Sequence, residues 1–124
     1  MGDHEGRNVL IIDDDDDLRH ALRLLFEFED FQVVGEAKDG LEAVALARAL
    51  KPDFALVDQS MPRMPGDEAA NLIRALSPET RIVAFSAVLS RKPEWADAYL
   101  NKERIVEVVP LLRYLIDGSR TGVA

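Results

Sequence analysis

The sequence contains no cysteine, which excludes a disulfide framework and a thiolate metal site. Positive charge is also in short supply, because 15 lysines and arginines stand against 23 aspartates and glutamates and the formal net charge is -8. Nucleic acids are bound by basic surfaces, so we expect no direct nucleic acid binding by this chain. No apolar run approaches the roughly 18 to 20 residues of a membrane span, so we expect no membrane association.

The first residues, 1–7, are polar and lack the apolar centre of a signal peptide. We therefore expect a disordered N-terminus and a cytoplasmic protein. The 124 residues fit one domain, and 48% hydrophobic with 31% charged residues is typical of a globular chain with a real core. We expect that domain at 8–117, followed by a C-terminal tail or the start of a linker at 118–124.

Short apolar runs alternate with longer stretches of helical periodicity, which is the pattern of an α/β domain. We expect buried strands at residues 8–12, 31–37, 54–57, 82–85 and 98–101. We expect helices around residues 18–26, 41–49, 69–76 and 105–116. Asp16 or Asp17 can cap the first helix, and Pro110 implies that the last helix is kinked or begins later than its apolar stripe. This alternation predicts a mostly parallel sheet covered by helices on both faces.

Polar side chains follow four of the predicted strands at the point where each strand ends. They are Asp13 and Asp14 after the first strand, Asp58 after the third, Ser86 after the fourth and Lys102 after the fifth. In parallel α/β sheets, ligands bind outside the carboxyl ends of the strands, so we expect these side chains to converge on one edge.

Three carboxylates in a small cleft repel one another, and a divalent cation with oxygen ligands relieves that cost. We therefore interpret Asp13, Asp14 and Asp58 as a Mg²⁺ site, although the acidic run by itself also fits a solvated loop that caps a helix. A lysine beside such a cleft can pair with a phosphoryl oxygen, and a hydroxyl can donate a hydrogen bond to it. Lys102 and Ser86 fit these roles together, whereas each alone is also an ordinary strand-end residue.

Four motifs occur in an order that is itself informative: IIDD at 11–14, PDFALVDQSMPRMPG at 52–66, FSA at 85–87 and AYLNK at 98–102. The set resembles the receiver domains of bacterial two-component response regulators. The resemblance implies a flavodoxin-like, doubly wound, five-stranded parallel sheet in the order 2-1-3-4-5, with helices on both faces. It also identifies 8–117 as the expected receiver domain.

The resemblance implies a metal site and a phosphoacceptor at the motif residues. Asp58 would accept the phosphoryl group, and Mg²⁺ would be held by Asp13, Asp14, Asp58 and the backbone carbonyl of Ser60. Phosphoryl transfer needs mainly positioning and charge neutralisation, which these groups supply. Such a domain is a phosphoacceptor signalling protein rather than an enzyme that turns over a substrate.

The remaining motif residues would couple phosphorylation to a change of surface. Ser86 would be the switch hydroxyl that closes on the phosphate, Lys102 would bind a phosphoryl oxygen, and Tyr99 would be an aromatic switch that swings inward. The implied donor is a sensor histidine kinase or a phosphotransfer protein. The implied receiver of the signal is a downstream protein or a fused output domain, and a homodimer is compatible with the sequence.

The segment between the fourth and fifth predicted strands departs from the family, because it is shorter by more than one helical turn and contains Pro93. We therefore expect the fourth helix to be short or absent, without the standard output surface. Val88, Leu89 and Trp95 in this segment form either an apolar patch or a cover for the core, and we favour the cover. Apolar Val88 stands where water would approach the phosphorylated aspartate, so we expect slow loss of phosphate.

Two alternative functions remain open from the sequence. One is a receiver-like docking module that works without phosphorylation, which the shortened segment allows. The other is a haloacid-dehalogenase-like phosphatase, whose D-x-D signature Asp13 and Asp15 imitate. Asp17 stands where that signature expects threonine or valine, and no paired acidic motif follows Lys102.

Overall fold

The computed structural model describes residues 6–121, and the side chains of residues 6–118. In chain order its elements are β1 (Asn8–Ile12), α1 (Asp16–Phe28), β2 (Gln32–Ala37), α2 (Gly40–Leu50), β3 (Phe54–Val57), α3 (Gly66–Leu76), β4 (Arg81–Ser86), β5 (Ala98–Asn101), the 3-10 helix η1 (Lys102–Glu107) and α4 (Val108–Thr121). The strands form one parallel sheet in the order β2-β1-β3-β4-β5. The predicted fold class and strand order are therefore confirmed.

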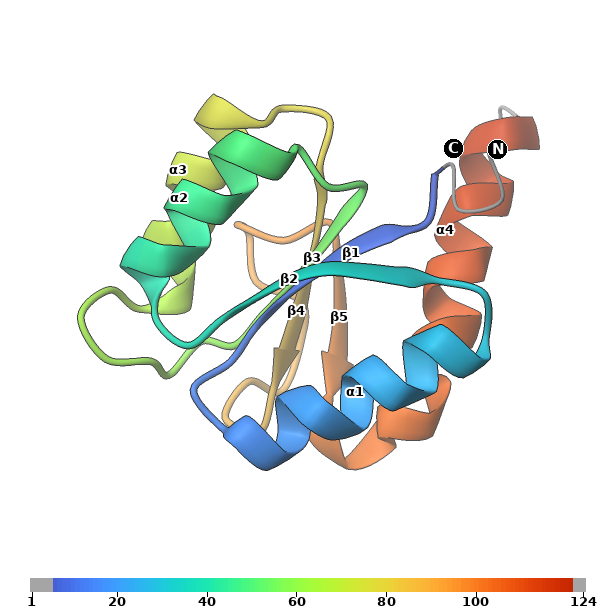
Figure 1. Cartoon of the computed structure of the whole chain (residues 1–124), viewed down its shortest axis with the longest axis horizontal. Coiled ribbons are helices and arrows are strands. Elements are labelled where there is room, and N and C mark those ends of the chain that lie inside the picture. The colour runs from blue at the N-terminus through green and yellow to red at the C-terminus, as the bar shows by residue number, and fades with distance from the viewer. Residues whose placement is uncertain (1–5, 122–124) are drawn as a thin grey trace.

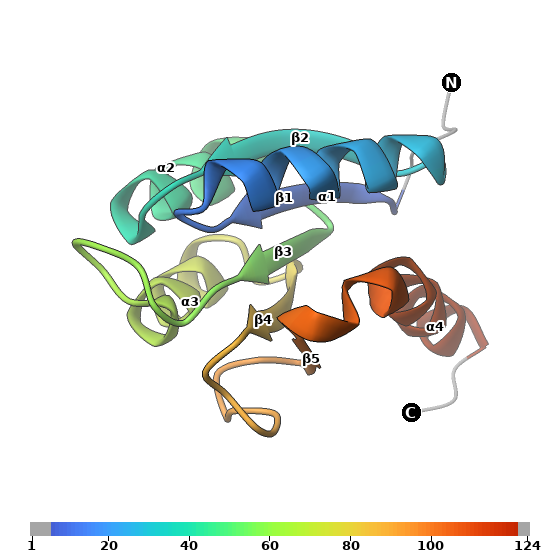
Figure 2. The ribbon, with the colours of Figure 1, turned by 90° about the horizontal axis from the view of Figure 1, so that it is seen from below.

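Helices cover both faces of this sheet, as Figures 1 and 2 show, with α1 and α4 on one face and α2 and α3 on the other. Successive strand residues point to opposite faces, so each buried strand feeds two cores. Ile11 and Leu56 belong to the core under α1 and α4, whereas Ile12 and Val57 belong to the core under α2 and α3. The near-continuous apolar runs in the sequence reflect this burial on both sides.

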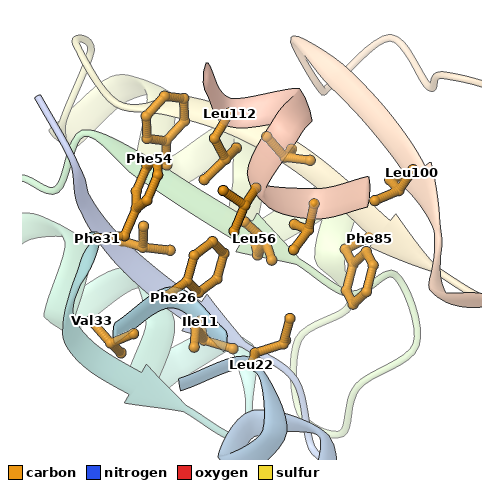
Figure 3. Close-up of a cluster of buried hydrophobic side chains, with 14 of the residues drawn as sticks. Ile11, Leu22, Phe26, Phe31, Val33, Phe54, Leu56, Phe85, Leu100 and Leu112 are labelled. Atoms are coloured by element: carbon orange, nitrogen blue, oxygen red, sulfur yellow. The ribbon is translucent and has the colours of Figure 1, made fainter. Parts of the chain in front are cut away.

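The larger core is rich in aromatic rings, and Figure 3 shows it beneath α1 and α4. Phe26 of α1 and Phe31, which precedes β2, have ring centroids 5.7 Å apart at an interplanar angle of 52°. Leu112 of α4 is fully buried in the same core. Burial of side chains of this size supplies about 1.5–3 kcal/mol each, which fixes both helices against the sheet.

The helix ends correct one expectation and confirm another. The cap of α1 is Asp15, whose side chain accepts the Leu18 N–H at 3.1 Å, so the expected caps Asp16 and Asp17 were wrong. Both of these lie in the first turn instead, where negative charge favours the helix dipole. Pro110 falls in the first turn of α4, where its missing N–H is harmless, and the α-helix begins later than the apolar stripe, as expected.

The helix that was expected to be short or absent between the fourth and fifth strands is absent, because residues 87–97, between β4 and β5, contain no helix. Leu89 and Trp95 from this segment pack against the core under α2 and α3, as favoured from the sequence. Val88 differs from them, because the residue is 65% exposed. Arg74 of α3 holds the segment by donating to the carbonyl of Trp95 at 2.9 Å.

Of the segment 1–7, which was expected to be disordered, residues 1–5 lie outside the described residues. Arg7 has a defined place, with its guanidinium carbon 5.6 Å from the ring centroid of Phe31 and its carbonyl accepting the Gln32 N–H at 3.0 Å. At the other end, α4 continues past the expected domain boundary at Asp117 as far as Thr121. Residues 122–124 lie outside the described residues. No helix in the described part of the chain is long and apolar enough to cross a membrane.

Candidate functional site

The two buried aspartates of the site are held by backbone hydrogen bonds between neighbouring strands. Asp13 follows β1, and its N–H donates to the carbonyl of Ala37 at the end of β2, at 2.9 Å. Asp58 follows β3, and its N–H donates to the carbonyl of Ile12 at 3.0 Å. Because β1 is the neighbour of both β2 and β3, this register sets the two carboxylates side by side at the carboxyl edge of the sheet.

Lys102 brings a positive charge to the same edge. It directly follows β5, and its Nζ lies 2.7 Å from Oδ2 of Asp13 and 3.4 Å from Oδ2 of Asp58. Asp14 completes the cluster from the solvent side, and ligand atoms of the three aspartates lie within 4.8 Å of one another. Four of the residues predicted from the sequence therefore meet at one place.

The electrostatics of the cluster leave its negative charge only partly compensated. Burial raises the pKa of Asp58 above its ordinary value of 3.8, and the charge of Asp13 raises it further. The nearby ammonium of Lys102 and the N–H of Ser60 oppose this rise. Burial lowers the pKa of Lys102, but its pairing with the two carboxylates outweighs burial and raises that pKa above 10.5. When all are ionised, three negative charges face one positive charge, which leaves a net charge of two negative units.

This donor set suits a hard divalent cation. All three side chains offer carboxylate oxygens, which Mg²⁺ prefers, and their spacing of at most 4.8 Å allows one ion to contact them. Two of the carboxylates are buried and one is exposed, so water can complete the ligand shell from outside. The residues present therefore fit Mg²⁺, and the uncompensated charge gives a reason for it to bind.

The loop from Gln59 to Pro65 is folded back onto Asp58. The Gly66 N–H donates to the carbonyl of Gln59 at 2.9 Å, and a β-carbon on Gly66 would lie only 2.2 Å from the carbonyl oxygen of Asp58. Only glycine permits this approach. Ser60, whose carbonyl was expected as a metal ligand, brings its N–H close enough to Asp58 to lower the pKa of that carboxylate.

Ser86 and Tyr99 lie near this edge but are engaged elsewhere. Ser86 is fully buried, and its Oγ accepts the Val88 N–H at 3.2 Å. Tyr99 is half-buried, packs against the core under α2 and α3, and donates its hydroxyl to the carbonyl of Leu89. Within residues 6–118, neither hydroxyl is hydrogen-bonded to Asp58. Both are instead tied to the segment that replaces the fourth helix.

Several residues that support the site were missed by sequence reasoning. Arg19 of α1 donates to the carbonyl of Asp13 at 2.7 Å and also pairs with Glu36 of β2 at 3.1 Å. Arg63 of the β3–α3 loop pairs with Asp39 at the start of α2 at 3.2 Å. No local pattern announces such pairs, because their partners are distant in sequence. Gly66 has a detectable signal, since a glycine that follows Pro65 and shortly precedes a helical pattern is typical of a turn.

The fold and the acidic edge define a class of protein, an α/β domain of the flavodoxin-like arrangement with a carboxylate cluster at the carboxyl edge of its sheet. The sequence profile of the response regulator receiver domain matches residues 9–103. The nitrate/nitrite response regulator protein NarL of Escherichia coli (strain K12) is 37% identical over 110 residues, covering 83% of this chain and 51% of NarL. The chemotaxis protein CheY of Thermotoga maritima is 37% identical over 83 residues, covering 67% of this chain and 69% of CheY.

Solved structures agree with these sequence relatives. The response regulator domain of Thermotoga maritima CheB superimposes with a TM-score of 0.78 at 29% identity, covering 86% of this chain and 93% of that one. This chain belongs to the response regulator receiver domain family. Receiver domains are signalling domains of two-component systems rather than enzymes in the ordinary sense. The first relatives are longer proteins, of which this chain covers between 38% and 58%.

Proposed function

We propose that this domain is switched by Mg²⁺-dependent phosphorylation of Asp58. The observation that carries the proposal is the buried carboxylate of Asp58 beside Asp13, Asp14 and the Lys102 ammonium, which lies 3.4 Å from it. A phosphoryl group brings more negative charge to this edge. The site can accept that charge because Lys102 is already in place and because the three carboxylates suit a divalent cation.

In the proposed reaction, an oxygen of Asp58 attacks the phosphorus of a phosphohistidine. The new O–P bond forms as the N–P bond breaks, and the imidazole leaves with the electron pair and takes up a proton. Asp13, Asp14, Asp58 and the carbonyl of Ser60 would hold Mg²⁺, which when bound would neutralise charge on the phosphoryl oxygens. Lys102 would pair with one of those oxygens, so its task is charge compensation before and after transfer.

The change of surface would begin at Ser86. Its Oγ accepts the Val88 N–H, but no described acceptor receives its own proton, so the hydroxyl can donate to a phosphoryl oxygen. A movement of Ser86 would disturb the segment at 87–97, which is also bound by Tyr99 through the carbonyl of Leu89. Phosphorylation would then shift the population of this segment rather than create a new fold.

The proposal places the domain in the cytoplasm, with a sensor histidine kinase or a phosphotransfer protein as donor. A downstream protein or a fused output domain would read the phosphorylated surface, with or without homodimer formation. The absence of the fourth helix favours one second candidate, a docking module that works without phosphorylation. Membership of the receiver family argues against the haloacid-dehalogenase-like phosphatase.

Intact-mass measurement after incubation with acetyl phosphate and Mg²⁺ tests the proposal. We expect a single phosphate adduct on the wild type that is lost in Asp58→Asn and in excess chelator. Asp67→Asn, which removes an exposed carboxylate from the start of α3, serves as the matched control and should keep the adduct. An adduct that survives Asp58→Asn would refute Asp58 as the acceptor. No adduct from either acetyl phosphate or a panel of phosphorylated histidine kinases, together with no Mg²⁺ binding, would favour the docking module.

A further inference from the structure

The loop that carries Ser60 is anchored at its far end to a different part of the sheet edge. Nε of Arg63 lies 3.2 Å from Oδ2 of Asp39, the residue that caps α2. Next to it, the buried side chain of Met64 packs directly on Gly40, where a β-carbon would lie 2.4 Å from that of Met64. The loop after Asp58 is therefore docked onto the first turn of α2.

Asp39 is built into the fold on both of its carboxylate oxygens. Oδ1 accepts the Glu42 N–H at 2.9 Å and caps α2, while Oδ2 faces Arg63. The Asp39 side chain is 7% exposed, so if the guanidinium of Arg63 is lost, little water can reach the carboxylate to take its place. The β2–α2 turn that holds Asp39 starts at Ala37, whose carbonyl also binds the N–H of Asp13. The pair thus joins the loop after Asp58 to the turn beside Asp13.

Arg63 adopts a backbone conformation that residues with a β-carbon disfavour. Its φ is +67°, in the left-handed region, although it is not glycine. Its side chain is 63% exposed, so burial of the side chain does not account for this conformation. The Met64 N–H donates to the carbonyl of Pro62 at 2.7 Å and closes a tight turn around Arg63, and the ion pair with Asp39 and the packing of Met64 hold this turn against α2.

We propose that Arg63 and Asp39 form a positioning pair, which holds the β3–α3 loop so that Ser60 and Asp58 present a preformed Mg²⁺ site. The inference rests on the proposed function, because it concerns the same site. Within residues 6–118, neither residue is hydrogen-bonded or ion-paired to Asp58. Their effect passes through the loop backbone, which runs from Asp58 through Ser60 to Arg63 and is closed by the Gly66 N–H on the carbonyl of Gln59 at 2.9 Å.

Charge alone predicts the opposite sign, which makes the proposal sharply testable. Removing the positive charge of Arg63 from an acidic edge should strengthen cation binding if only long-range electrostatics act. If Arg63 positions the loop, its removal should weaken Mg²⁺ binding instead. Asn is the suitable replacement, because it tolerates a left-handed backbone and so removes the ion pair without adding backbone strain.

The experiment measures Mg²⁺ affinity by following the backbone amide resonances of residues 58–61 in an NMR titration. We expect Arg63→Asn to raise the Mg²⁺ dissociation constant roughly three- to tenfold, and Arg63→Lys to recover most of the affinity. Asp39→Asn retains a capping oxygen and removes the same ion pair. The Arg63→Asn/Asp39→Asn double variant should therefore lose no more Mg²⁺ affinity than the single variant that binds Mg²⁺ less tightly. Arg113→Asn is the matched control, since it removes the same charge from a 3.1 Å pair with Glu29 that joins α4 to α1.

A second readout needs no metal and separates the two proposals. In the metal-free protein, the 15N relaxation of Ser60 should show increased mobility in Arg63→Asn and wild-type order in Arg63→Lys and Arg113→Asn. Unchanged Ser60 order, or equal or tighter Mg²⁺ binding by Arg63→Asn, would overturn the positioning pair. If even the wild type fails to bind Mg²⁺, the proposed function fails, and the metal-free measurement alone decides the role of Arg63.

Discussion

Replacement of Lys102 by methionine is the most informative perturbation of the acidic edge. Within the described residues, Lys102 is the only side-chain cation paired with the carboxylates of Asp13 and Asp58, at 2.7 Å and 3.4 Å. Methionine has a similar length and no charge, so the variant leaves two buried carboxylates close together without a counter-ion. The consequence should appear in stability, in its pH dependence and in Mg²⁺ binding.

The structure sets the size of the expected loss. At an effective dielectric constant of about 20, opposite unit charges at these two separations attract by roughly 5 to 6 kcal/mol each. The loss of hydration offsets most of this gain, at several kcal/mol per ion. Lys102 keeps 21% of its side-chain exposure, so we place the loss near the lower end of about 3–5 kcal/mol for a broken buried pair. Lys102→Met should therefore lower the free energy of unfolding by about 3 kcal/mol at neutral pH.

The loss should depend on pH with a defined sign. Asp58 already has a raised pKa in the folded protein, and removal of Lys102 raises it further, because Lys102 lowers it. Protonation of this carboxyl removes the repulsion that the variant suffers. The difference between variant and wild type is therefore complete above the raised pKa and fades as the pH falls towards 3.8, the ordinary value.

Urea unfolding followed by circular dichroism, at neutral pH and at about pH 4, measures both effects. Lys38→Met, which removes the same charge from an exposed position, is the control and should change stability by less than about 0.5 kcal/mol. Because Lys102 competes with a cation for the same carboxylates, Lys102→Met should also bind Mg²⁺ more tightly than the wild type and recover stability in its presence. A variant as stable as Lys38→Met at neutral pH, with unchanged Mg²⁺ affinity, would refute the assigned charge balance.

Three further predictions concern the same edge. Asp58→Asn should stabilise the protein at neutral pH by about 1 kcal/mol in thermal or urea unfolding, because burial and the charge of Asp13 both disfavour the ionised carboxylate in the folded state. A gain in stability that persists unchanged below pH 3.8 would contradict this cause. Gly66→Ala should abolish labelling by acetyl phosphate while circular dichroism still shows a folded chain, because the new β-carbon meets the Asp58 carbonyl at 2.2 Å; normal labelling would show that the loop has room to move. Val88→Glu should shorten the lifetime of the phosphorylated protein several-fold in a mass-spectrometric decay, because a carboxylate at this exposed position can orient water, and an unchanged lifetime would count against slow loss of phosphate by this route.

The strands were predictable because burial on both faces leaves a simple local trace. The apolar runs that end at Ile12 and Val57 coincide with β1 and β3 at both ends, and the polar residue after each run marks the carboxyl end. The parallel connection then brings those ends to one edge, so Asp13, Asp58 and Lys102 could be assigned to a common site before their distances were known. The shortness of the segment between β4 and β5 likewise predicted that no full helix forms there.

Local choices among equivalent residues were harder to predict. Asp15, Asp16 and Asp17 can all cap a helix, and Asp15 is the one with an extended backbone and a side chain that accepts the Leu18 N–H. The Asp15 N–H is fixed by Oδ1 of Asp13 at 3.0 Å, a contact that the acidic run does not reveal. The choice of cap therefore depends on the site next to it.

The sequence by itself determined the layers and the identity of the acidic edge, because hydrophobic period and strand ends are encoded residue by residue, while the strand order followed from the resemblance of its motifs to receiver domains. Only the tertiary structure decided which distant side chains pair, such as Arg63 with Asp39 and Tyr99 with the carbonyl of Leu89. Those contacts depend on the meeting of separate segments after folding. The partners of such an ion pair or hydrogen bond are far apart in the sequence and follow no repeating pattern, so no local signal predicts them.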